Sequence, residues 1–223
     1  MCPVPPAKQG PAYDGHVDFY YTFDGRDWHR IYKGFTYYQQ PEISEVIPPF
    51  LSTEGGKLGV RGKYFLYEYY GTDLNCKIGD SLGYAVYVND TFIYCEFSQV
   101  LTNKDKQQYL SVSLNSQSYT APSNATKVSV FSVTNMNPKS GVVAGGTQIT
   151  IEGRDFPTGY VPLCRFGVAQ ATQTVSGYLV NSQQLVCTAP AITKPDNAAY
   201  PLEVMFSLNF GDDDYSKKFF SWF

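Results

Sequence analysis

Short runs of alternating polar and apolar residues, bounded by glycine or proline, recur along the chain. The clearest run is Thr147–Ile151, which lies between the pair Gly145–Gly146 and Gly153. A period of two is typical of a β-strand that buries one face, and the flanking glycines permit turns that other residues resist. No long window repeats apolar residues with the period of an α-helix. The pattern therefore predicts an all-β chain.

The same succession of elements recurs at a fixed spacing. Ile43–Pro48 parallels Val133–Pro138, and Gly55–Phe65 parallels Gly145–Phe156. Cysteines at matched places lie about 90 residues apart, a period that indicates an array of domains: Cys2, Cys95 and Cys187.

The elements of the C-terminal repeat together form one long motif. The pattern P-x-x-G…GGT-x-I-T-I-x-G-x-x-F…C-x-F-G…C-x-x-P, from Pro138 to Pro190, resembles the IPT/TIG family of immunoglobulin-like domains, and the resemblance covers Val133–Phe223. It implies tandem immunoglobulin-like β-sandwiches. With the repeat, residues 1–40 are interpreted as the C-terminal part of an IPT/TIG unit, 41–132 as a divergent IPT/TIG domain and 133–223 as an IPT/TIG domain. Because the junctions contain almost no linker, the array is expected to be elongated and stiff.

Five cysteines are present, which is an odd number. In each complete unit one cysteine precedes a glycine-containing turn and another ends a later strand, which predicts the disulfides Cys76–Cys95 and Cys164–Cys187. Each bridge closes a loop of about 20 residues and is worth roughly 3 kcal/mol by chain entropy. Cys2 is left without an assigned partner. Buried free thiols, which are common in sandwich cores, remain the alternative.

Composition and motifs argue against several functional classes. The net charge is −3 and no cluster of Lys or Arg exceeds a pair, so neither nucleic acid nor an anionic membrane is an expected partner. No apolar run reaches the length of a membrane span, and no direct membrane insertion is expected in this segment. His16 and His29 show no metal-ligand spacing, and no G-x-S-x-G elbow exists. The chain is expected to be no enzyme and to hold no cofactor or metal.

Three further segments have ordinary interpretations. Gly55–Lys63 lacks the spacing of a phosphate loop, and Asp212–Asp214 is better explained as a solvated hairpin turn than as a calcium site. The tyrosines between Tyr64 and Tyr70 are expected in an inter-domain seam, with stacking on sugar as the alternative. Met1–Pro5 lacks the features of a signal peptide, so a secreted form is expected to be an internal segment or to have lost its leader.

Two N-x-S/T sequons, at Asn89 and Asn124, add to the predicted disulfides. Together they favour an extracellular or cell-surface location with N-linked glycans on both asparagines.

The favoured hypothesis is a non-enzymatic structural or adhesion protein. Its partners would be other copies of itself or neighbouring IPT/TIG units, and strand addition at the half unit 1–40 would give a head-to-tail filament. The ordinary explanation of the half unit, that the sequence was cut from a longer array, is preferred, and both explanations predict a rod. The resemblance leaves two alternatives open, namely a stalk or ligand-binding segment of a plexin-like receptor ectodomain and a carbohydrate-binding accessory module.

Overall fold

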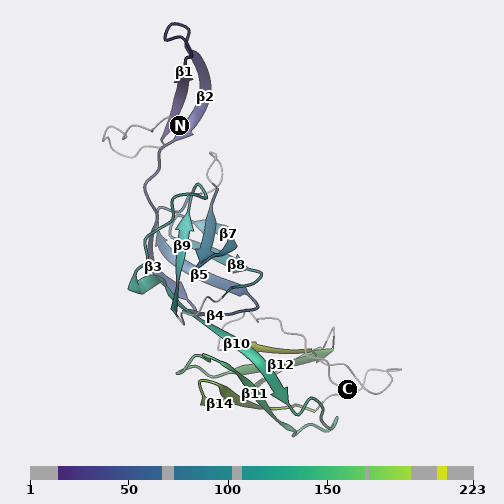
Figure 1. Ribbon diagram of the computed structural model, residues 1–223. Coiled ribbons are helices and arrows are strands. Elements are labelled where there is room, and N and C mark those ends of the chain that lie inside the picture. Colours follow the sequence, from purple (N-terminus) through teal and green to yellow (C-terminus); the bar gives the residue numbers. More distant parts are fainter. Residues whose placement is uncertain (1–14, 67–72, 102–106, 169–170, 192–204, 210–223) are drawn as a thin grey trace.

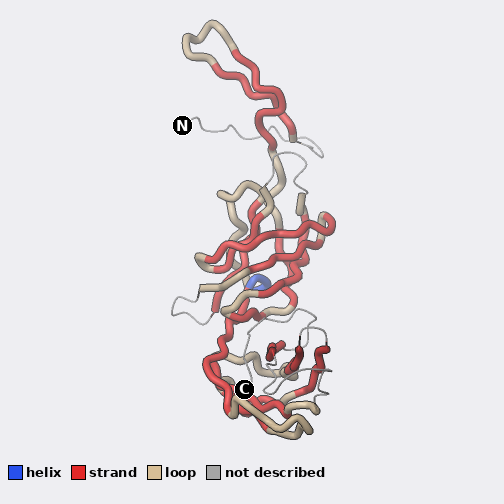
Figure 2. Tube along the Cα trace, turned by 90° about the vertical axis from the view of Figure 1, so that its right-hand side faces the viewer, coloured by secondary structure: helices blue, strands red, loops and turns tan. Residues whose placement is uncertain are grey.

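The computed structural model describes residues 15–66, 73–101, 107–168, 171–191 and 205–209, and these residues are almost entirely β-strand. They form three parts in chain order: an N-terminal hairpin, a middle sandwich and a C-terminal sandwich. The three parts follow one another along an elongated molecule (Figure 1). The view turned by 90° shows the same order along the same long axis (Figure 2). The expectation of an all-β, elongated array of immunoglobulin-like sandwiches is confirmed.

The strands have the following bounds. The hairpin comprises β1 (His16–Tyr21) and β2 (His29–Thr36). The middle sandwich comprises β3 (Glu42–Ile47), β4 (Phe50–Ser52), β5 (Gly56–Lys63), β6 (Asn75–Ile78), β7 (Ser81–Asn89), β8 (Phe92–Phe97) and β9 (Gln107–Ser113). The 3-10 helix η2 (Asn124–Thr126) then leads into β10 (Lys127–Asn137). The C-terminal sandwich adds β11 (Gln148–Arg154), β12 (Leu163–Val168), β13 (Ala171–Ser176), β14 (Tyr178–Asn181), β15 (Gln184–Thr188) and β16 (Met205–Asn209).

The middle sandwich packs two antiparallel layers around one core. Strands β3, β5, β8 and the second half of β7 form one layer, and the first half of β7, with β6, β9 and β10, forms the other. β7 changes layers at Tyr84, which pairs with both Asn75 and Glu96. The inner faces meet through apolar side chains that are removed from water, which stabilises the packing; the members with no exposure include Leu58, Val60, Ile78, Ile93, Leu110 and Val112.

The C-terminal sandwich repeats this plan. One layer runs β14–β15–β11–β10 and the other β13–β12–β16. Ile149 and Ile151 of β11 are fully buried while Gln148 and Glu152 are exposed, so the predicted strand and its buried face are confirmed. Phe156 is also buried, with 2% of its surface exposed.

The two sandwiches share their strand register. Leu58 pairs with Cys95 in the middle sandwich, and Ile149 pairs with Cys187 in the C-terminal one. Each sandwich also has a bulge at a matched place: β3 shifts register against β5 between Ile43 and Glu45, and β10 shifts register against β11 between Val133 and Asn135. A shared bulge indicates a shared plan, because bulges re-aim a strand at one defined place.

A matched pair of glycines makes the same close contact in each unit. A Cβ on Gly62 would collide with the carbonyl of Glu42 and lie 2.7 Å from the Phe65 ring. A Cβ on Gly153 would collide in the same way with the Ser132 carbonyl and the Phe156 ring. Only glycine lets the strand and the phenylalanine approach this closely.

The hairpin β1–β2 stands apart from both sandwiches in the described part of the chain, where it pairs with no third strand. Phe19 faces Ile31 across the hairpin and Tyr20 faces Arg30, whose guanidinium forms an ion pair with Asp18. Phe19, Tyr20 and Ile31 are each at least 40% exposed. The hairpin therefore has an apolar and a polar face, both open to solvent.

Candidate functional site: the junction between the two sandwiches

One strand belongs to both sandwiches. The first residues of β10, Lys127–Ser129, pair with β9, and Ser129–Phe131 pair in parallel with β4. The residues that follow, Ser132–Asn137, pair with β11 of the C-terminal sandwich. The proposed boundary between residues 132 and 133 thus lies inside a continuous strand, and Figure 1 shows β10 running from one sandwich into the next. No loop separates the two units at this point.

Phe50 of β4 anchors the second sandwich to the first. Its side chain is 5% exposed and belongs to the C-terminal core, whereas that of its neighbour Leu51 belongs to the middle core. The Phe50 ring meets Tyr160 edge to face at a centroid distance of 4.7 Å. Such an arrangement is favourable beyond the area that it buries.

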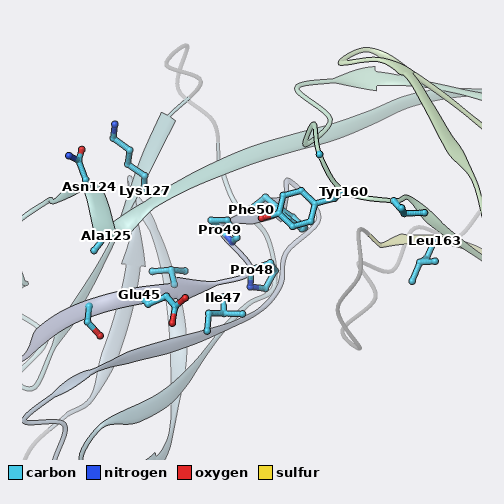
Figure 3. A pocket seen from close by; sticks show the side chains of 14 residues that line it. Glu45, Ile47, Pro48, Pro49, Phe50, Asn124, Ala125, Lys127, Tyr160 and Leu163 are labelled. Atoms are coloured by element: carbon cyan, nitrogen blue, oxygen red, sulfur yellow. The ribbon is translucent and has the colours of Figure 1, made fainter.

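A groove of about 850 Å³ runs along this junction (Figure 3). Its walls come from the end of β3, the Pro48–Pro49–Phe50 segment, η2 and the loop around Tyr160. Tyr160 is 42% exposed and Val161 58% exposed. The groove is mainly apolar, with one acidic and one basic side chain, Glu45 and Lys127. No group of His, Cys, Asp or Glu among the described residues is arranged to hold a metal ion.

A second junction connects the hairpin to the middle sandwich. Tyr38 packs against the middle core, and burial raises the pKa of its phenol while a hydrogen bond with Ser118 opposes that effect. Burial also raises the pKa of nearby Tyr119, with a smaller contribution from the charge of Asp73.

The four cysteines that the sequence analysis paired form two disulfides, one in each sandwich. Cys76 is bonded to Cys95 with a Cα–Cα distance of 5.8 Å, and Cys164 is bonded to Cys187 with a Cα–Cα distance of 6.4 Å. Each joins the two layers of its sandwich, and all four cysteines are at most 1% exposed. Cys2 lies outside the described residues.

The two sequons differ in their surroundings. Asn89, the last residue of β7, and Thr91, in the turn that follows, are both exposed, whereas Thr126 of the other sequon is 1% exposed. The Thr126 hydroxyl donates to the Ser123 carbonyl and accepts from the Ser123 N–H, both at 3.0 Å. Asn124 itself is exposed at one end of the junction groove.

Two expectations concern residues that the structure does not describe: the tyrosines Tyr67, Tyr69 and Tyr70, and the run Asp212–Asp214. Tyr64, which precedes the first group, is 37% exposed and has a φ of 64°. Within the described ranges no helix is long and apolar enough to cross a membrane.

The sequence analysis missed Phe50 and Tyr160. A signal was present, because an aromatic residue directly after two prolines, between two predicted strands, is well placed for a contact at a domain end.

Residues 132–216 match the model of the IPT/TIG domain. The chain carries an IPT/TIG domain. Among solved structures, this chain is similar to two of the plexin A4 extracellular region. The first is 14% identical over 77% of this chain and 15% of that chain, with a TM-score of 0.48. The second is 16% identical over 82% of this chain and 18% of that chain, with a TM-score of 0.41. It is also similar to the surface glycan-binding protein PbSGBP-B from Prevotella bryantii, at 12% identity over 78% of this chain and 40% of that chain, with a TM-score of 0.31. None of these likenesses bears on function, and no curated protein matches.

Proposed function

We propose that the chain is a non-enzymatic structural or adhesion segment of an extracellular or cell-surface protein, in which IPT/TIG units form a stiff rod. The observation that carries the proposal is β10, whose eleven residues pair with both sandwiches without an intervening loop. A strand shared in this way holds the two units at a fixed relative orientation, which a spacer or stalk requires and a catalyst does not.

The middle sandwich is part of the same proposal. Residues 41–132 share the register, the bulge and the glycine–phenylalanine contact of the IPT/TIG unit in 133–223. We therefore assign them to a second IPT/TIG unit, and residues 1–40 to the end of a further one.

The extracellular location is supported by sulfur chemistry and by the sequons. Two buried disulfides at matched positions are typical of an oxidising compartment. N-linked glycans on Asn89 and Asn124 are the modification expected of sequons in a secreted protein. No nucleic acid, cofactor or metal is part of this function.

The hairpin β1–β2 supports self-association as the finer form of the proposal. Its exposed Phe19, Tyr20 and Ile31 and its lack of a third strand, among the described residues, suit strand addition by another copy or by a neighbouring IPT/TIG unit. Successive additions of this kind would give a head-to-tail filament.

The rod is tested by distance measurement. Spectroscopic labels attached without cysteine chemistry at the exposed residues Ser98 and Ser176 report one distance across the junction. We expect a single narrow distance distribution that does not change with viscosity or salt. A broad distribution would show a flexible joint and would refute the rod. Regular fibrils in negative stain support the filament, and a chain that stays monomeric at high concentration refutes the filament alone.

A further inference from the structure

The sequon at Asn89 lies opposite an aromatic side chain. Asn89 is the last residue of β7 and pairs directly with Phe92, the first residue of β8. The strands shift register here, between Tyr87 and Asn89, so that two residues of β7 lie opposite Phe92. Residues opposite one another across two strands project from the same side of the sheet. That face is the outer one, because the next residue of β8, Ile93, is fully buried in the core and Asn89 is exposed. Asn89 and Phe92 are therefore neighbours on the outside of the middle sandwich.

The turn presents the Asn89 amide in one orientation. Its Oδ1 accepts hydrogen bonds from the Thr91 N–H at 2.9 Å and from the Thr91 hydroxyl at 2.8 Å. Its Nδ2, the atom that bears an N-linked glycan, makes no hydrogen bond to any described residue. The carboxamide is thus held by its oxygen while its nitrogen remains available.

Phe92 is the aromatic side chain that is best placed to receive a sugar. Its ring lies against Gly59 of β5, with Cζ 3.0 Å from the position that a Cβ there would occupy, and the residue is half-buried. The neighbouring Tyr94 meets it edge to face at 4.9 Å, and Lys57 lies over the Tyr94 ring at 4.0 Å. Because Lys57 already occupies the Tyr94 face, the Phe92 ring is the apolar surface beside Asn89 that remains partly open.

We propose that the first N-acetylglucosamine of a glycan on Asn89 packs its apolar face against the Phe92 ring and so covers this part of the sheet. The inference rests on the proposed extracellular function, which supplies the glycan. In the transfer step, a lipid-linked oligosaccharyl diphosphate loses the bond between its anomeric carbon and phosphate. The Asn89 Nδ2 forms the new bond to that carbon, and the amide proton leaves with the diphosphate. The gain comes from apolar sugar and ring surface removed from water on both sides.

The C-terminal sandwich offers a matched control. Asn181 occupies the equivalent turn, where its Oδ1 accepts from the Gln183 N–H at 2.8 Å, and it pairs with Gln184 in place of an aromatic residue. Gln183→Thr would complete a sequon at Asn181 in the same backbone geometry. The two sites differ mainly in the residue that faces the glycan.

The experiment uses the full chain secreted from a glycosylating host. One sample is treated with an endoglycosidase that leaves a single N-acetylglucosamine on each site. Another is treated with an amidase that hydrolyses the side-chain amide, which releases the whole glycan and leaves aspartate. Mass spectrometry gives the occupancy of each site, and the new carboxylate is common to the wild type and the ring variant, so it cancels when the two are compared. Melting temperature and hydrogen exchange of the β7–β8 hairpin are then compared. We expect the single sugar to retain the full stabilisation, and its removal to lower the melting temperature of the middle sandwich by about 2–5 °C.

Phe92→Leu keeps an apolar side chain over Gly59 but removes the flat ring. In that variant, removal of the glycan should change the melting temperature by less than about 1 °C, which isolates the coupling between sugar and ring. A glycan at Asn181 in the Gln183→Thr variant should be neutral, and the further change Gln184→Phe should make it stabilising.

Each result is decisive. Equal effects of glycan removal in the wild type and in Phe92→Leu overturn the inference and leave the proposed function standing. Secreted material in which Asn89 carries no glycan also overturns it. Material that is not secreted, with all five cysteines reduced and neither sequon occupied, refutes the extracellular function itself.

Discussion

Phe50→Ala should destabilise the C-terminal sandwich although Phe50 lies on a strand of the middle one. The side chain is 5% exposed and packs in the C-terminal core, so its loss leaves a cavity there. Truncation of a buried phenylalanine costs about 3–5 kcal/mol, and the value should lie near 3 kcal/mol here because the adjoining groove lets Tyr160 move into part of the space. For a sandwich of about 90 residues, this corresponds to a fall in melting temperature of roughly 12 °C or more.

Hydrogen exchange read by mass spectrometry assigns the loss to one sandwich. In Phe50→Ala we expect faster exchange in β11 and β15, with protection of β5 and β8 unchanged. Leu51→Ala is the matched control, because the neighbouring side chain packs in the middle core and should give the opposite distribution. If Phe50→Ala instead loosened β5 and β8 and left β11 and β15 protected, Phe50 would not anchor the second unit and the reasoning would be refuted.

Three other changes test separate parts of the molecule. Cys164→Ala should cost about 2–5 kcal/mol by removing one of the two bridges, and an unchanged melting temperature would contradict that pairing. Gly153→Ala should destabilise the C-terminal sandwich by more than the roughly 0.5 kcal/mol that is usual for a surface substitution, because the added Cβ collides with the Ser132 carbonyl. Urea unfolding measures the loss, and equal unfolding midpoints would show that the strand can move to accommodate the methyl group. Burial raises the pKa of Tyr38, so the folded state holds the phenol proton more tightly than the unfolded state does. Its contribution to the free energy of unfolding is complete below the ordinary pKa of 10.0 and declines as the pH rises above that value. Tyr38→Phe should therefore reduce the loss of stability with pH in this alkaline range, and an unchanged slope of stability against pH would show that Tyr38 does not cause that loss.

Local pattern was enough to predict most of the C-terminal strand framework. The alternation in Thr147–Ile151 places Ile149 and Ile151 inside because a strand turns successive side chains to opposite faces. The repeat likewise placed Phe65 and Phe156 at matched positions, and both are buried. These features depend on a few consecutive residues and on spacing, which the sequence records directly.

The junction could not be predicted from local pattern. Phe50 and Leu51 are both apolar and adjacent, and a strand must point them in opposite directions. Which of them enters which core depends on where β4 lies between the two sandwiches, and this is a property of the assembled units. The hairpin shows a related limit, since β2 begins at His29 and includes Arg30, two polar residues that no apolar alternation would have selected.

The strand β10 also explains why the joint should resist bending. To tilt one sandwich against the other, the chain must deform between Phe131, which pairs with β4, and Ser132, which pairs with β11. A large tilt would break ladder hydrogen bonds on at least one side, at about 1 kcal/mol each, and would draw Phe50 out of the C-terminal core at about 3 kcal/mol. Backbone bonds such as Thr53 N–H to the Phe131 carbonyl, at 2.8 Å, would be lost together with them. Because these losses occur at once and at the same residues, bending requires local unfolding of β4, and smaller forces should be transmitted from one unit to the next without a change in their angle.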